Sequence, residues 1–217
     1  ITSPDITLGG NLVTTGNQAY GGAVQVQGPL AITANAADFV GPVDTNGFDL
    51  SLDIAGTSRL RDNITSNAQL QLSGSGTLSI EGPANTLDTL NMDGVSLTVA
   101  DSSVVILNGL VSHSAGTIDA WATGSSVRYH QNADSLIIPG PYNQVTFDSG
   151  ADVVTYSLVD QTAVSESLDI VSANSILDLL GNTLTIDTAT VTLDGNIVDS
   201  GTGHLVIFGP TTLWNET

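Results

Sequence analysis

The sequence contains no lysine and no cysteine, and its three arginines stand against 22 acidic residues, which gives a formal net charge of −19. A chain with this charge repels the phosphates of nucleic acids and anionic lipids, so nucleic acid is not expected as a partner. No run of about 18 apolar residues occurs, and no membrane insertion is expected. Disulfides are excluded, but 217 residues are enough to bury a core without them.

Charged and aromatic side chains are scarce as well, at 12% and 5% of the residues. Nineteen of the acidic residues are aspartates, which favour turns and strand ends over helices. The apolar residues are mostly Val, Ile and Leu, and they stand in short alternating runs, as in SILDLLGNTLTIDTATVTLDG (Ser175–Gly195). This pattern predicts an all-β protein.

Segments of one design recur along the chain, each with a glycine, one or two polar residues and then an apolar–x–apolar triplet. Examples are GFDLSLDIAG (Gly47–Gly56), GTLSIEG (Gly76–Gly82) and GHLVIFG (Gly203–Gly209). The first apolar residues of neighbouring segments are 19 to 21 residues apart, as in the pairs Leu30 and Leu50, Leu78 and Leu97, Leu97 and Ile118, and Leu184 and Leu205. A period of about 20 residues with several short strands predicts a parallel β-solenoid.

The predicted solenoid has roughly ten coils and forms a single domain over residues 1–217, with a soft internal boundary near residues 63–75. Coils stacked about 4.8 Å apart would give a rod of about 50 Å. The alternative is a β-sandwich, for which LNMDGVSL (Leu90–Leu97) supplies a hairpin signal through Asp93-Gly94.

A solenoid of parallel coils ends in two open sheet edges, which need a cap or a partner. The candidate capping or assembly residues are the apolar side chains of the two terminal segments: Ile6, Leu8, Phe208, Leu213 and Trp214. They form either a self-contained cap or a docking surface for the next subunit. Head-to-tail stacking of subunits would be open and would make a filament.

Catalytic and metal-binding patterns are weak. Arg128, Tyr129 and His130 suggest the basic and tyrosine residues of a polysaccharide lyase, but strand alternation places Tyr129 opposite the other two. Acid pairs such as Asp187 and Asp194 are expected by chance among nineteen aspartates. No calcium-binding repeat or histidine pair occurs, so no catalytic residue and no cofactor is predicted; calcium stays an open candidate, and any metal site is unknown.

Two stretches near the N-terminus, Ile6–Val26 and Gly28–Gly56, resemble the repeats of filamentous-haemagglutinin-like adhesins. The matching residues of the first are Thr14, Thr15, Gly16, Asn17, Gln18, Tyr20, Gly22, Ala23 and Val24. Those of the second are Phe39, Gly41, Val43, Asp44, Leu50, Leu52 and Gly56. Residues 142–186 are similar to another unit common in bacterial surface proteins. The resemblance implies a right-handed β-helix outside a bacterial cell, with an adhesive, matrix or filament role and no catalytic residues.

The sequence therefore predicts a secreted, non-enzymatic cell-surface solenoid, an adhesin rod or a self-assembling filament subunit. Its expected partners are further copies of itself, end to end, or the rest of a longer rod, with surface carbohydrate as a further candidate. The first residue is Ile1, which suggests a processed subunit or a piece of a longer protein. The alternative function is a carbohydrate-binding or polysaccharide-degrading β-helix of the lyase or tail-spike type. The low number of tryptophans, Trp121 and Trp214, argues against it, because sugars stack on aromatic faces.

Overall fold

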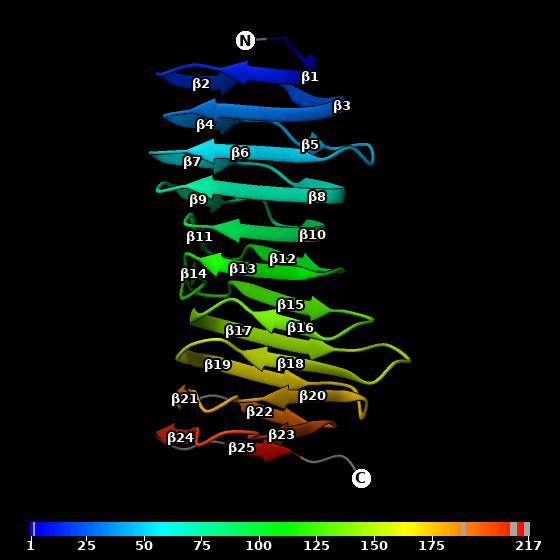
Figure 1. The fold of residues 1–217 in the computed structure, drawn as a ribbon, viewed down its shortest axis with the longest axis vertical. Helices are drawn as coiled ribbons and strands as arrows, with labels where there is room; N and C mark the ends of the chain where they lie inside the picture. Colours follow the sequence, from blue (N-terminus) through cyan, green and yellow to red (C-terminus); the bar gives the residue numbers. More distant parts are fainter. Residues whose placement is uncertain (2, 188–189, 209–211, 215–217) are drawn as a thin grey trace.

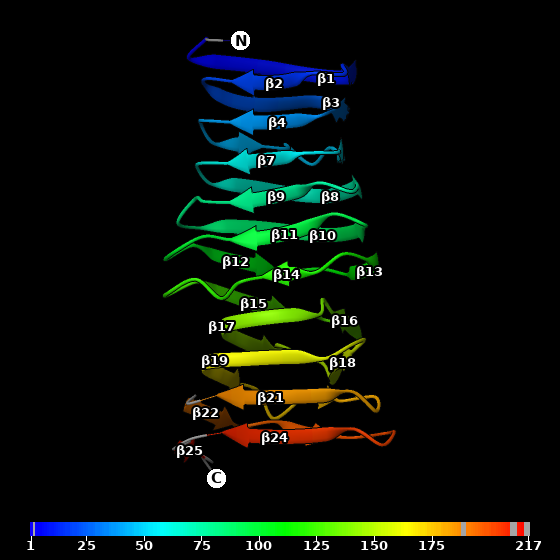
Figure 2. The ribbon, with the colours of Figure 1, turned by 90° about the vertical axis from the view of Figure 1, so that its left-hand side faces the viewer.

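The chain winds into a stack of three-sided coils that are paired throughout by parallel strands (Figures 1 and 2). The computed structural model describes residues 1, 3–187, 190–208 and, for their backbone, 212–214. As the chain descends from the N-terminus it crosses the front of Figure 1 from right to left and returns behind, so the coil is right-handed. This confirms the predicted β-solenoid of about ten turns.

Each coil contributes a strand to face 1, then to face 2, then to face 3. In the first five coils, one bent strand often covers faces 1 and 2 together, as in β1 (Asp5–Val13), β3 (Ala23–Ala34), β8 (Ile64–Gly74) and β10 (Asn85–Asp93). Face 1 also contains the separate strands β5 (Val43–Asp44), β12 (Val104–Leu107), β15 (Ser126–His130), β22 (Thr190–Leu193) and β25 (Thr212–Trp214).

Faces 2 and 3 are made of shorter strands. Face 2 continues through β6 (Leu50–Ile54), β13 (Val111–Ala115), β16 (Ser135–Ile137), β18 (Val154–Leu158), β20 (Ser175–Asp178) and β23 (Asn196–Val198). Face 3 holds β2 (Asn17–Tyr20), β4 (Ala36–Phe39), β7 (Thr57–Leu60), β9 (Thr77–Ile80), β11 (Ser96–Val99), β14 (Ile118–Asp119), β21 (Thr183–Asp187) and β24 (His204–Phe208).

The position of the bent strand changes halfway along the rod. In β17 (Gly140–Asp148) and β19 (Thr162–Ile170) one strand covers faces 3 and 1, not faces 1 and 2. Its first part continues face 3, because Ala120 after β14 bridges to Tyr142 in parallel. Its second part continues face 1, where Val127 pairs with Val145. The three faces thus persist while the sharp corners move.

Stacked apolar residues fill the interior in columns. On face 2, buried side chains follow one another at the same register position: Leu30, Leu50, Leu70, Leu90 and Val111. On face 1, a second column contains Val105, Val127, Val145, Leu168 and Val191. Parallel stacking repeats one side-chain position every coil, so the period seen in the sequence is the spacing of these columns.

The hairpin signal at Asp93-Gly94 does not correspond to a hairpin in the structure. The strands that flank it, β10 and β11, pair in parallel with strands of neighbouring coils, β8 and β9 among them. Gly94 has a φ of +88° and turns the chain at the corner from face 2 to face 3. A two-residue turn signal is therefore shared by hairpins and solenoid corners. The parallel pairing of β10 and β11 with neighbouring coils also excludes the β-sandwich alternative.

The polar stretch near residues 63–75 is occupied by β8, which pairs with β5 and β6 on one side and β10 on the other. No helix long and apolar enough to cross a membrane occurs in the described part of the chain.

Candidate functional site

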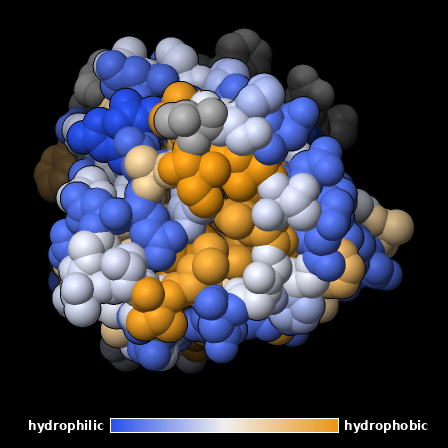
Figure 3. Space-filling view, turned by 90° about the horizontal axis from the view of Figure 1, so that it is seen from above, coloured by the Kyte–Doolittle hydropathy of each residue, from blue (hydrophilic) through white to orange (hydrophobic). Residues whose placement is uncertain are grey.

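The N-terminal end of the solenoid is apolar at its centre. Seen from above, hydrophobic side chains lie inside a hydrophilic rim (Figure 3). Of the predicted assembly residues, Ile6 is buried, and Leu8 is partly buried and packs against the core together with Leu12. These residues belong to β1, which is the first strand of its sheet. This end therefore presents both apolar side chains and a strand edge.

The C-terminal end presents apolar side chains as well. Leu205 and Ile207 pair with the buried residues Leu184 and Ile186 one coil earlier, as the spacing predicts, but they are 43% and 42% exposed. Phe208, a predicted assembly residue, is 55% exposed. Leu205 and Ile207 thus continue the core columns of Leu184 and Ile186 into the last described coil of face 3.

The other two predicted assembly residues, Leu213 and Trp214, lie on β25. The backbone of β25 extends face 1, because Leu213 pairs with Val191 and Trp214 with Thr192. Their side chains lie outside the described residues.

The two ends have matching outlines. Face 1 begins with the first half of β1 and reaches β25, face 2 begins with the second half of β1 and reaches β23, and face 3 runs from β2 to β24. The strands at both ends run in the same direction, since all pairing is parallel. A further coil placed on the C-terminal end, or on faces 1 and 2 of the N-terminal end, would meet the edge of a parallel ladder. On face 3 of the N-terminal end, Ile1 already lies on the edge of β2: its amino group donates to the carbonyl of Ala19, and its carbonyl accepts from the backbone N–H of Gly21.

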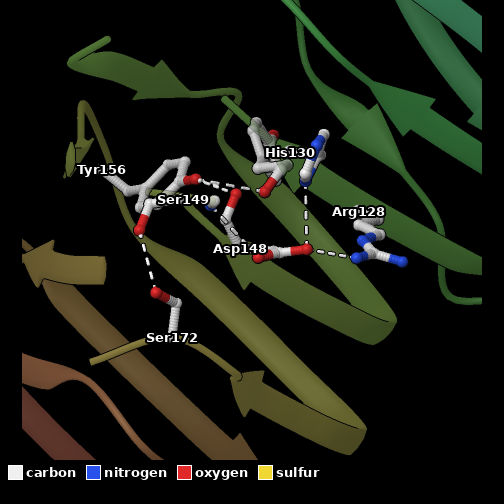
Figure 4. Close-up of polar contacts among 8 residues, drawn as sticks. Arg128, His130, Asp148, Ser149, Tyr156 and Ser172 are labelled. Carbon is white, nitrogen blue, oxygen red and sulfur yellow. Dashed lines mark hydrogen bonds and ion pairs between the residues drawn. The ribbon is translucent and has the colours of Figure 1, made fainter. Parts of the chain in front are cut away.

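A polar cluster lies on face 1 near the middle of the rod (Figure 4). Arg128 and His130 extend from β15, and both contact Oδ2 of Asp148 on β17, His130 through Nδ1 at 3.0 Å. Burial raises the pKa of Asp148, but the hydrogen bonds from Arg128 and His130 outweigh it and hold the pKa below its ordinary value. The carboxylate thus ties two neighbouring coils together.

The third member of the lyase-like triplet, Tyr129, points the other way, as strand alternation predicts. Its ring is buried and its hydroxyl lies 2.8 Å from that of Tyr142. Tyr156 donates its hydroxyl proton to the carbonyl of Asp148 at 2.7 Å from within the core. The three residues 128–130 therefore do not converge on one point: Arg128 and His130 contact Asp148 of the next coil on the outside, and Tyr129 packs in the core.

The acid pair considered in the sequence, Asp187 and Asp194, lies on two different faces. Asp187 ends β21 on face 3, whereas Asp194 follows β22 on face 1. Within the described residues no group of three or more histidines and acids could hold a metal ion. Calcium stays an open candidate.

The sequence analysis missed Asp148 as the partner of Arg128 and His130. Its signal is the coil spacing, because Asp148 lies 18 residues after His130 and pairs with it directly across the ladder. Opposite charges that lie one coil apart on the outward side of a strand predict an ion pair between neighbouring strands.

Replacing Asp148 should cost stability at neutral pH. Asp148→Asn removes the anion that two cationic or proton-donating groups share, and we expect the free energy of unfolding to fall by about 1–2 kcal/mol, because hydrogen bonds to a charged group contribute in this range. Urea unfolding followed by circular dichroism measures this. Asp152→Asn, an exposed aspartate on the following corner, is the matched control and should change stability by less than about 0.5 kcal/mol.

The stabilisation that Asp148 provides through Arg128 and His130 depends on pH, because the pKa of Asp148 is lowered in the folded chain. Its contribution is present above the pKa of an unfolded aspartate, about 3.9, and is lost as the pH falls through the folded value. The difference between wild type and Asp148→Asn should therefore shrink below about pH 4. A difference that stays constant down to pH 2 would contradict a role for the charge.

A comparison with protein-family models finds no family that matches the chain, and comparisons with curated proteins and with solved structures find no match either. Function is therefore argued from the geometry of the solenoid and its surfaces.

Proposed function

We propose that this chain is a non-catalytic structural element of an extracellular rod, and that its copies stack end to end. One observation carries the proposal: among the described residues, both ends leave apolar core positions open, together with the strand edges of faces 1 and 2. A coil of a second copy fits each end, because it has the strand direction and core columns that continue the stack; further coils of a longer rod would fit in the same way. The resemblance of residues 6–56 to adhesin repeats supports a location outside the cell.

Stacking would bury the exposed apolar side chains of an open end and pair its free backbone groups. The exposed parts of Leu205 and Ile207 at one end, and of Leu8 and Leu12 at the other, would enter a continuous core. The edge N–H and C=O groups would complete a parallel ladder. Because the interface joins two different ends of the molecule, it is heterologous, and repetition makes a linear filament.

Charge opposes this association and makes it dependent on salt. Each copy carries a net charge of −19, so two copies repel at low ionic strength. We therefore expect the association constant to increase as salt is added, since screening reduces the repulsion while the apolar contact persists.

Charged substitutions in the end faces should prevent association. Leu8→Asp at the N-terminal end and Ile207→Asp at the C-terminal end each place a carboxylate in the proposed contact, where desolvation without a partner is costly. In sedimentation equilibrium, the mass-average of the wild type should rise with concentration in high salt, and both variants should stay monomeric.

Two controls keep this test interpretable. Val153→Asp puts the same charge at a corner between faces 1 and 2, on a side chain that is 65% exposed, and should associate like the wild type. Circular dichroism melts of all variants separate loss of association from loss of fold. A wild type that stays monomeric at every concentration and salt level would overturn the proposal, and so would equal effects of the end variants and Val153→Asp.

A further inference from the structure

A shallow depression of about 580 Å³ crosses three consecutive coils on face 3. Glu81 lies in the first of these coils, Thr98 and Asp101 in the second, and Asp119 and Trp121 in the third. Thr98 and Asp119 are direct partners in the parallel ladder of β11 and β14. Its volume falls within the range of about 300–1,000 Å³ that is common for small-molecule sites.

The indole of Trp121 is more exposed than the rings of the tyrosines. All four tyrosines are buried, whereas Trp121 is 44% exposed at the wall of this depression. The apolar body of an indole suits the flat C–H face of a sugar ring.

The corner that holds Trp121 is fixed by several hydrogen bonds. The backbone N–H of Trp121 donates to Oδ1 of Asp119 at 3.4 Å. The carbonyl of the preceding residue, Ala120, accepts from the hydroxyl of Ser125 at 2.6 Å and from the backbone N–H of Asn143. Ala120 itself is buried. The indole is therefore carried by a corner that is ordered before any ligand arrives, which lowers the entropic cost of binding.

Hydrogen-bond acceptors line the same depression as the indole. Asp101 and Asp119 are exposed carboxylates, and Thr98 adds a hydroxyl that donates and accepts. Glu81 at the far side contacts Arg59 at 3.7 Å. Sugar hydroxyls need acceptors spaced along one side of an apolar platform, and this depression supplies both.

We propose that this depression binds a neutral oligosaccharide, with one ring stacked on Trp121 and hydroxyls of the same or the next ring donating to Asp119 and Asp101. The inference gives the proposed rod a ligand class, and it rests on that proposal only for its location outside the cell. A cationic peptide is the rival ligand. It is less favoured because Asp101 and Asp119 are exposed, and ion pairs with exposed carboxylates contribute about 0–1 kcal/mol in water.

The test uses the two indole N–H signals that the two tryptophans give in a ¹⁵N–¹H correlation spectrum. Cellohexaose, maltohexaose, chitohexaose and hexalysine are titrated separately into the wild-type chain at low salt and low protein concentration, where we expect it to be monomeric. One indole signal should shift with at least one of the neutral sugars, and this signal should be missing in Trp121→Phe. The shift should persist when salt is raised.

Variants then assign the contacts. Trp121→Ala should weaken sugar binding at least tenfold, Trp121→Phe less, and Asp119→Asn several-fold. Phe48→Ala, which removes an exposed aromatic from the corner between faces 1 and 2, should leave the affinity unchanged. No shift of the Trp121 signal with any of the three sugars would overturn the proposal, and so would binding of hexalysine alone that disappears in high salt. Neither result bears on the end-to-end association, which is measured without ligand.

Discussion

Gly116→Ala is expected to lower the free energy of unfolding by about 3–5 kcal/mol, the combined cost of a strained backbone and an overpacked contact. Gly116 turns the chain from face 2 to face 3 with a φ of +101°, a conformation that residues with a side chain rarely adopt. A Cβ there would also overlap the backbone carbonyl of Val95, one coil away. Since that carbonyl belongs to the stacked corner itself, neither partner can move without separating two coils.

The control for this prediction is Gly28→Ala. Gly28 lies within the bent strand β3, has no positive φ, and a Cβ there meets no atom within 4 Å. Its replacement should change stability by less than about 1 kcal/mol. Urea denaturation of both variants measures the difference. Equal stabilities of Gly116→Ala and Gly28→Ala would show that the corner is not packed as described.

Unfolding in alkali is expected to begin near pH 10 and to follow the tyrosines. Burial raises the pKa of Tyr129 to about 12 and raises the pKa of Tyr142 and Tyr156 as well. Below the ordinary pKa of about 10 these groups are neutral in both states and do not affect the pH dependence. Above it the unfolded chain loses protons that the folded chain keeps, so stability falls by up to about 1.4 kcal/mol per pH unit for each buried tyrosine.

The tyrosines dominate the titration in this pH range, because the sequence has no lysine and no cysteine side chains that would lose protons there. A pH titration followed by phenolate absorbance and by circular dichroism should show both signals changing together, cooperatively, above pH 10. Tyr142→Phe should reduce the slope of stability against pH in this range by up to about 1.4 kcal/mol per pH unit. Phenolate absorbance that rises at the ordinary tyrosine pKa while the β-sheet signal persists would contradict the described core.

Much of the fold can be predicted from the sequence because one physical rule repeats. Each coil must place an apolar residue at the same register position, so Leu30 and Leu50, or Leu78 and Leu97, mark the stacking directly. The alternation that places Tyr129 inward and Arg128 and His130 outward follows from the strand pleat, and the structure has this pattern.

The remaining features depend on contacts between coils of unequal length. One coil takes 18 residues, from Ile6 to Val24, and another takes 23, from Thr146 to Asp169. Corners absorb this variation, and a corner such as Asp93-Gly94 has the same local chemistry as a hairpin turn. The pairing of His130 with Asp148, and the depression beside Trp121, need the register across coils, which the period alone gives only to within a few residues.

Small-angle X-ray scattering at increasing protein and salt concentration tests the central claim, that the chain is a rod whose copies stack end to end. The cross-sectional radius should stay constant while the maximum dimension grows beyond the length of one subunit, about 50 Å for ten coils at about 4.8 Å each. Growth of the cross-section, or a maximum dimension that stays at one subunit under all conditions, would contradict it.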